Sequence, residues 1–250
     1  MRVDQPQAAA WVMLVVSALA GWAAPAVAQT RIPQVPDASP QKPLTQRPRG
    51  IYVGSSAGSN FLPGETVADP GWAHLDPGLA LSGNAGFAVG NGLRVDLELD
   101  YRENHLSQVT FEGVRQHARG TQKTLGTMVN AYYDIPLLSW ATPYVGFGGG
   151  YQWTGWLSTQ FNGPSGTGLM RVNDPLGGFA FQGISGIAVP FPAVSGLSVT
   201  AEYRFMDVVG HKSFEGTSAS AAGIVPARVT VGNNLNHTIL FGVRYSFGWP

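Results

Sequence analysis

The chain of 250 residues contains no cysteine and little charge. The absence of cysteine excludes a disulfide framework, a thiolate metal site, a cysteine nucleophile and a lipidated cysteine anchor. Charged residues make up only 12% of the chain, about half of their usual share in soluble domains. The 15 basic and 15 acidic residues cancel, so no basic field exists to hold nucleic acid, and we expect no nucleic-acid partner.

The chain also lacks an apolar run of the roughly 20 residues that a membrane-spanning helix needs. A shorter apolar run, residues 11–20, precedes Gly21, Pro25 and the small-x-small pattern Ala26-Val27-Ala28. This arrangement is typical of a secretory signal peptide, which we predict over residues 1–28. Five prolines within residues 29–49 predict an extended Pro-rich periplasmic leader. Residues 50–250 are then the folded domain.

The folded part shows a period of two instead of a helical period. In residues 93–102, Leu, Val and Tyr at odd positions alternate with Arg, Asp and Glu at even positions, and residues 197–206 and 238–247 follow the same pattern. Such alternation predicts strands with one apolar and one polar face. Weaker strands are predicted over residues 50–58, 79–90, 120–134, 143–156 and 176–189. Gly146, Gly148 and Gly150 occupy expected inward positions, which suits a tightly curved wall with little room inside.

The predicted connections alternate between short and long. Asn91-Gly92 predicts a type I′ hairpin turn, and two short Pro-containing links cover residues 136–142 and 190–196. The four long connections cover residues 59–78, 103–119, 157–175 and 208–235. An even number of antiparallel strands with this loop pattern predicts an all-β fold, an eight-stranded transmembrane β-barrel with short periplasmic turns and long extracellular loops.

Strict alternation alone does not say which face points inward, because a soluble calycin barrel would turn its apolar face to the interior. Aromatic residues near the strand ends favour the membrane barrel, where they form girdles at the two interfaces. The expected girdle residues are Tyr52, Tyr101, Tyr133, Trp153, Trp156, Tyr203, Tyr245 and Phe247.

The last strand, Gly242-Val243-Arg244-Tyr245-Ser246-Phe247, resembles the C-terminal signal by which outer-membrane barrels are recognised for assembly. With Gly50-Ile51-Tyr52-Val53-Gly54 and the Gly-rich segment 143–151, it is similar to the opacity-protein/OmpA-type small barrels, especially alphaproteobacterial surface antigens. The resemblance covers about residues 50–248. It implies an outer-membrane location and assigns Gly242, Tyr245 and Phe247 to an assembly signal for the barrel assembly machinery. Many relatives carry a C-terminal peptidoglycan-binding domain, which we do not expect here.

The expected inward face carries four basic and four acidic side chains, which we predict to form a salt-bridge network in a narrow lumen. The residues are Arg94, Asp96, Glu98, Asp100, Arg102, Glu202, Arg204 and Arg244. A catalytic or metal-binding cluster of Asp96, Glu98 and Asp100 is the less favoured interpretation. His105-Leu106-Ser107 faintly resembles the His-x-Ser of lipid A deacylases, but Gln108 stands where those enzymes have asparagine. We therefore expect no catalytic, cofactor-binding or metal-ligating residues, and no cofactor.

The leading hypothesis is a non-enzymatic outer-membrane barrel with a structural or surface-exposed role, in envelope integrity, adhesion or as a surface antigen. Expected partners are outer-membrane lipids, lipopolysaccharide, the barrel assembly machinery and an extracellular or host ligand at the loops. The alternatives are a narrow passive porin for small solutes, a lipid A-modifying enzyme and a secreted calycin that binds an apolar ligand.

Overall fold

The computed structural model describes residues 48–66, 71–111, 113–162, 169–210, 212–220, 223–232 and 234–247. The predicted signal peptide, nearly all of the predicted leader and Trp249 therefore lie outside the described residues. Within the described residues, no helix has both the length and the apolarity needed to cross a membrane.

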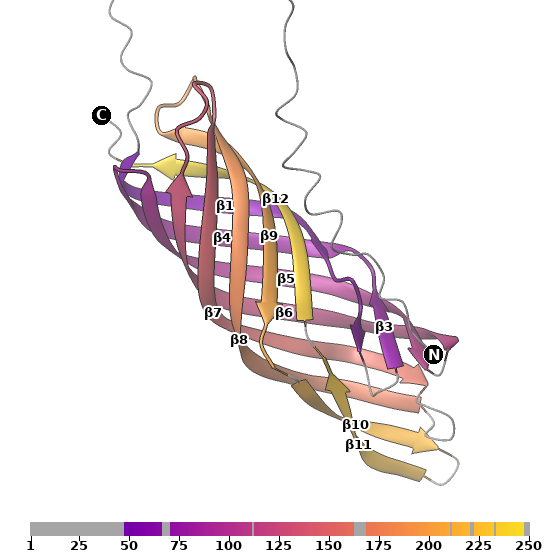
Figure 1. The fold of residues 1–250 in the computed structure, drawn as a ribbon. Coiled ribbons are helices and arrows are strands. Elements are labelled where there is room, and N and C mark those ends of the chain that lie inside the picture. Colours follow the sequence, from indigo (N-terminus) through magenta and orange to yellow (C-terminus); the bar gives the residue numbers. More distant parts are fainter. Residues whose placement is uncertain are drawn as a thin grey trace, which may run out of the picture. The chain divides into compact units, whose positions relative to one another are not determined.

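The described residues form twelve strands, and eight of these strands close into a ring (Figure 1). The ring order is β8-β7-β6-β5-β4-β1-β12-β9, and the pairing of β8 with β9 closes it. Every pairing in the ring is antiparallel. The ring strands are β1 (Arg49–Phe61), β4 (Gly78–Val89), β5 (Leu93–Phe111), β6 (Val114–Asp134), β7 (Thr142–Asn162), β8 (Leu169–Pro190), β9 (Leu197–Val208) and β12 (Asn234–Ser246). These are the eight predicted strands, so the predicted barrel is confirmed.

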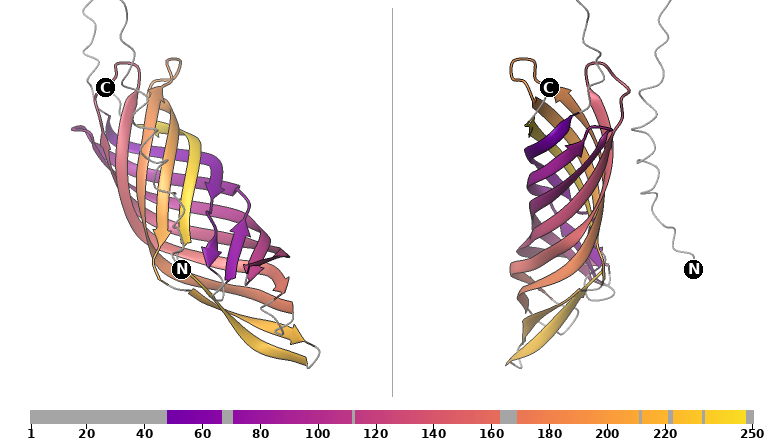
Figure 2. Two further views of the ribbon diagram at one scale, coloured as in Figure 1. Left: turned by 45° about the vertical axis from the view of Figure 1, so that its right-hand side comes forward. Right: turned by 90° about the vertical axis from the view of Figure 1, so that its left-hand side faces the viewer.

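Three of the four predicted long loops are mostly strand, and the fourth, residues 59–78, is partly strand, which corrects the sequence-based boundaries. β5, β6, β7 and β8 continue well past their expected ends, and two further hairpins extend the wall: β2 (Glu65–Thr66) with β3 (Gly71–Leu75), and β10 (Lys212–Ser220) with β11 (Gly223–Val231). β3 pairs with β5, and β10 pairs with β8 (Figure 2). The Gly-, Ser- and Asn-rich composition of these segments concealed their pairing, because small polar residues carry a weak alternation signal. We call this strand-built end of the barrel the extension.

The short connections lie at the opposite end of the barrel and match the predicted links between β6 and β7 and between β8 and β9. The predicted type I′ turn is wrong in its geometry. Gly90 and Gly92 have φ angles of 96° and 100°, whereas Asn91 does not have a positive φ. A type I′ turn needs positive φ at both central residues, so β4 and β5 are joined by a different three-residue turn, in which Asn91 Oδ1 accepts a hydrogen bond from Leu93 N at 3.0 Å.

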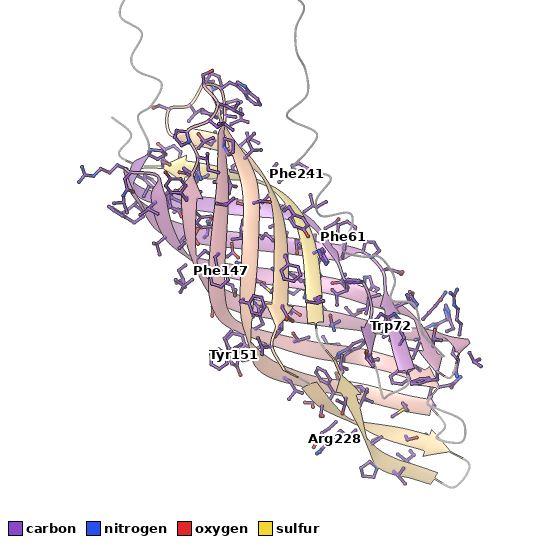
Figure 3. All side chains as sticks on the ribbon, viewed as in Figure 1. Phe61, Trp72, Phe147, Tyr151, Arg228 and Phe241 are labelled. Carbon is purple, nitrogen blue, oxygen red and sulfur yellow. The ribbon has the colours of Figure 1, made fainter. Side chains whose placement is uncertain are left out.

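Apolar side chains cover the outside of the ring and polar side chains fill its inside. On β5, Leu97 is 58% exposed while its neighbour Glu98 is 0% exposed. Phe147 of β7 and Phe241 of β12 lie on the same outer face (Figure 3). The five outward residues from Leu93 to Tyr101 cover about 20 Å along the barrel axis at the usual strand tilt. This height is close to that of the apolar band of a membrane barrel. This arrangement is the reverse of a soluble calycin, whose apolar face would be inside.

Two of the aromatic residues assigned to girdles lie inside the barrel instead. Tyr52 and Trp156 are 1% and 4% exposed, because both occupy inward positions of the alternation. Tyr133, Trp153, Tyr245 and Phe247 lie on the outer face.

The extension reverses the pattern of the ring, with an apolar core inside and mostly polar side chains outside, although Trp72, Ile224 and Val225 are exposed. Its core includes Leu106, Val109, Phe111, Phe161 and Phe214. On β5 and β7 a shift of pairing register, between Leu106 and Gln108 and between Trp156 and Thr159, turns the following apolar residues inward. The extension therefore has the core of a soluble β-sheet protein, stacked on a barrel with a membrane-type surface.

Candidate functional site: the polar lumen

The eight predicted charged residues all lie inside the barrel. β5 contributes Arg94, Asp96, Glu98, Asp100 and Arg102 because its even-numbered residues face inward; β9 contributes Glu202 and Arg204, and β12 contributes Arg244. Seven of these residues are buried, and the side chain of Glu202 is 12% exposed.

An ion pair crosses the centre of the lumen. Glu98 of β5 and Arg204 of β9 belong to strands separated by three others in either direction around the ring. Arg204 Nη1 lies 2.6 Å from both Oε1 and Oε2 of Glu98, and Arg204 Nη2 lies 2.6 Å from Glu202 Oε2. Gln182 of β8 donates to Glu98 Oε1 at 3.3 Å. Opposite walls of the barrel are thus joined through one arginine between two carboxylates.

The neighbouring carboxylates of β5 are satisfied differently. Asp96 accepts hydrogen bonds from Tyr52 Oη at 3.0 Å, Asn84 Nδ2 at 2.6 Å and Asn130 Nδ2 at 2.9 Å. No ion pair between Asp96 and an arginine is present among the described residues.

Asp100 pairs with Arg102, two residues along the same strand. Its second oxygen accepts from Gln152 Nε2 at 2.8 Å, so the carboxylate is held from two strands. Asp96, Glu98 and Asp100 point to one side of β5 as expected, yet each has its own set of partners. Among the residues that the structure describes, no three histidine or carboxylate side chains are arranged to hold a metal ion.

Arg94 has a partner that the sequence analysis missed. Its Nη2 lies 2.9 Å from Asp134 Oδ1, at the end of β6. The guanidinium carbon lies 4.5 to 5.3 Å from the ring centroids of Tyr52, Tyr132 and Tyr144. The alternation Asn130-x-Tyr132-x-Asp134 carries the signal that would have found this inward face.

Arg244 makes no ion pair among the described residues, which differs from the mutual neutralisation that we expected. Its guanidinium carbon lies 5.7 Å from the Tyr144 ring centroid. It also lines a small polar cavity, together with Ser56, Asn84 and Glu202.

An amide cluster lies at the level where the lumen meets the extension. Asn60 Nδ2 donates to Asn104 Oδ1 and to Asn236 Oδ1, both at 2.8 Å, and Asn60 Oδ1 accepts from Thr238 Oγ1 at 2.8 Å. The cluster joins β1, β5 and β12. Sequence reasoning missed it, because single asparagines in separate strands show no pattern.

The structure does not join His105 and Ser107 as a catalytic pair. His105 Nδ1 lies 3.3 Å from Thr121 Oγ1, and Ser107 Oγ donates to the backbone oxygen of His74 at 3.3 Å.

The residues of the expected assembly signal lie at the end of β12. Tyr245 and Phe247 have their ring centroids 4.9 Å apart and edge-to-face, and Phe247 N donates to Ile51 O at 2.8 Å. A side chain at Gly242 would place its Cβ 2.4 Å from Ser55 O, so this strand position accepts only glycine without a shift of β1.

The model of the family described as "Outer membrane protein beta-barrel domain" matches residues 14–247. An "Outer membrane protein" of Gluconacetobacter diazotrophicus is 32% identical over 217 residues, which are 82% of this chain and 54% of that protein. The chain thus spans about half the length of this relative.

Two solved structures of outer-membrane proteins are similar in fold. OprG from Pseudomonas aeruginosa has a TM-score of 0.51 at 14% identity, over 81% of this chain and 99% of that one. A major outer membrane protein from Thermus thermophilus has a TM-score of 0.50 at 14% identity, over 79% of this chain and 99% of that one.

Proposed function

Since this chain belongs to the outer membrane protein β-barrel domain family and is an outer-membrane protein, we propose that it acts as a structural barrel with a closed lumen and a surface-exposed extension. We further propose that it has no enzymatic activity. The link between Glu98 and Arg204 carries the proposal, because an ion pair across the axis fills the space through which a solute would pass.

The neighbouring contacts support a closed lumen. The interior of an eight-stranded barrel is only just wide enough for side chains. Here Asp96, Asp100, Gln152 and Gln182 add cross-strand hydrogen bonds on either side of the central pair. A charge in such a place is stable only when it is paired or hydrogen-bonded, so these contacts hold one another in position.

Conductance in planar lipid bilayers tests this proposal. We expect the wild-type barrel to show no stable openings. The double variant Glu98→Ala/Arg204→Ala, which removes the central link, should conduct, whereas Thr217→Ala on the exposed face of β10 should stay silent. Large, steady openings of the wild type would contradict a closed lumen, and the mobility shift on heating in SDS checks that each variant has folded.

A narrow pore is the second candidate, and the cavity beside Arg244 favours it. Ser56, Asn84 and Arg244 leave polar space there that water can occupy. In that case the wild type itself would conduct, and Arg244→Ala would increase its conductance. The Glu98→Ala/Arg204→Ala variant would then conduct little more than the wild type.

The direction of the extension decides its exposure to the cell exterior. We propose that the extension faces outward, since long hairpins of such barrels are extracellular and short turns periplasmic.

Gly113, in the turn between β5 and β6, has φ of 80° and no neighbouring atom within 4 Å of an added Cβ, so the turn has room for an inserted epitope. Antibody labelling of intact cells should detect an epitope at Gly113, and one inserted after Leu138, in the turn between β6 and β7, should be labelled only after permeabilisation. The reverse pattern would contradict this orientation. An adhesion partner at the extension is part of the same proposal.

A further inference from the structure

The outer face of the extension carries two arginines on the strands that flank β7. Arg119 of β6 and Arg171 of β8 are exposed, and neither makes an ion pair among the described residues. Arg115, farther along β6, is also exposed and makes no ion pair among the described residues, whereas two other cations differ in this respect. Lys123 lies 3.6 Å from Glu103 Oε2, and Arg228 lies 3.4 Å from Glu215 Oε1.

The strand register places these arginines in one row. Arg119 is opposite Gln160 of β7, and Gln160 is opposite Arg171. Neighbouring strands lie about 4.8 Å apart, so the two arginine Cα atoms are separated by about 10 Å with an amide between them. Gln160 faces outward only because the register shift before Thr159 turns Thr159 and Phe161 inward. The fold thus builds a row of two guanidinium groups and one amide, all exposed to solvent.

The row of Arg119, Gln160 and Arg171 lies beyond the apolar band that contacts lipid. On the outer face of β6, Leu125 is the apolar residue nearest the extension, and Arg119 precedes it by six residues. Six residues of strand span about 20 Å, which is about 15 Å of height at the usual tilt. The row therefore lies above the hydrocarbon layer, at the level of the sugar and phosphate groups of the surrounding outer leaflet.

We propose that Arg119, Gln160 and Arg171 bind phosphate groups in the inner core of lipopolysaccharide. Arginine binds phosphate through two parallel hydrogen bonds, and two arginines about 10 Å apart repel each other until an anion lies between them. The Gln160 amide supplies a further donor to the same anion. This inference rests on insertion in the outer membrane and on the proposed outward orientation of the extension, and it is independent of whether the lumen is closed.

The test uses the folded full-length barrel in detergent and purified rough lipopolysaccharide as the probe. Binding is measured by native mass spectrometry and by titration. We expect Arg119→Gln/Arg171→Gln to weaken binding at least tenfold. Arg228→Gln, a matched loss of an exposed but paired arginine on β11 (Figure 3), should change it less than twofold.

Two further probes identify the chemistry. Dephosphorylated lipopolysaccharide should bind the wild type as weakly as intact lipopolysaccharide binds the double variant, and inorganic phosphate at low millimolar concentration should not displace the lipid. The inference is overturned if the double variant binds like the wild type, if Arg228→Gln loses as much, if dephosphorylation has no effect, or if inorganic phosphate alone competes fully. Heat-dependent mobility in SDS confirms that each variant is folded.

Discussion

Arg204 is the residue on which the charge balance of the lumen centre depends, because one guanidinium faces both Glu98 and Glu202. Glu98→Gln would leave a neutral pair of Arg204 and Glu202. Arg204→Gln would leave two buried carboxylates without a cation. We therefore expect Arg204→Gln to lose about 3 to 5 kcal/mol of unfolding free energy, as for a broken buried ion pair, and Glu98→Gln to lose clearly less.

Urea unfolding of the two variants in lipid vesicles measures this difference. Equal losses for both would show that the two carboxylates do not share the arginine. The double variant Arg204→Gln/Glu98→Gln should be more stable than Arg204→Gln alone, since one of the unpaired charges is gone.

The two faces of β5 give a second prediction for single residues. Leu97 lies at mid-band on the outside, where arginine costs about 2 to 4 kcal/mol in a membrane barrel. Leu97→Arg should therefore lower the folded yield in vesicles, whereas His105→Arg, on the exposed face of β5 in the extension, should leave it unchanged. A neutral Leu97→Arg would mean that this face does not contact lipid.

At the scale of a strand, the bulge of β7 determines what the extension buries. Leu157 and Ser158 are both exposed there, and Ser158 has a φ of 50°, in the left-handed region that favours glycine. We expect Ser158→Gly to raise stability by a few tenths of a kcal/mol and Ser158→Val to lower it by about 1 to 2 kcal/mol. Thermal unfolding of the purified barrel measures both.

Deletion of Ser158 tests the same bulge by removing its extra residue. Between Trp156 and Thr159, β7 advances three residues while the paired β8 advances two, from Asp174 to Val172. Without Ser158 the ladder becomes regular, and alternation after Trp156 still turns Thr159 and Phe161 inward and Gln160 outward. The extension should therefore stay resistant to protease. Cleavage of the extension in this variant, with the membrane band still protected, would show that the bulge itself is needed to hold Phe161 in the core.

The strands of the ring could be read from the sequence, but the extension could not. In residues 93–102, apolar and charged residues alternate without exception. A strand with one apolar and one charged face is compatible with few folds. Val109 and Phe111 face inward only because the pairing register shifts beside Ser107, and no sequence pattern predicts that shift. The partner of Arg94 was missed for a related reason: Asp134 lies 40 residues away in sequence, and only the register of β5 and β6 brings the two together.

For the whole molecule, the end of β12 links the fold to its assembly. We propose that Phe247 and Tyr245 are read by the barrel assembly machinery. Phe247→Ala should then reduce the amount of folded barrel in outer-membrane fractions several-fold more than Trp249→Ala, which lies beyond the aromatic spacing. Equal yields from the two variants would refute this assignment.

The pattern reversal between ring and extension has a consequence for insertion. In the proposed outward orientation of the extension, the hairpin of β5 and β6 must carry Arg115 and Arg119 from the periplasm through a layer in which each bare arginine is strongly unfavourable. The apolar faces of the same hairpin would be stable in lipid, so an unassisted hairpin would tend to stop halfway. Translocation therefore requires the polar face to be kept from lipid, and the apolar face from stopping in it, until the hairpin reaches the cell exterior. We expect the crossing of this hairpin to be the slow step of barrel assembly.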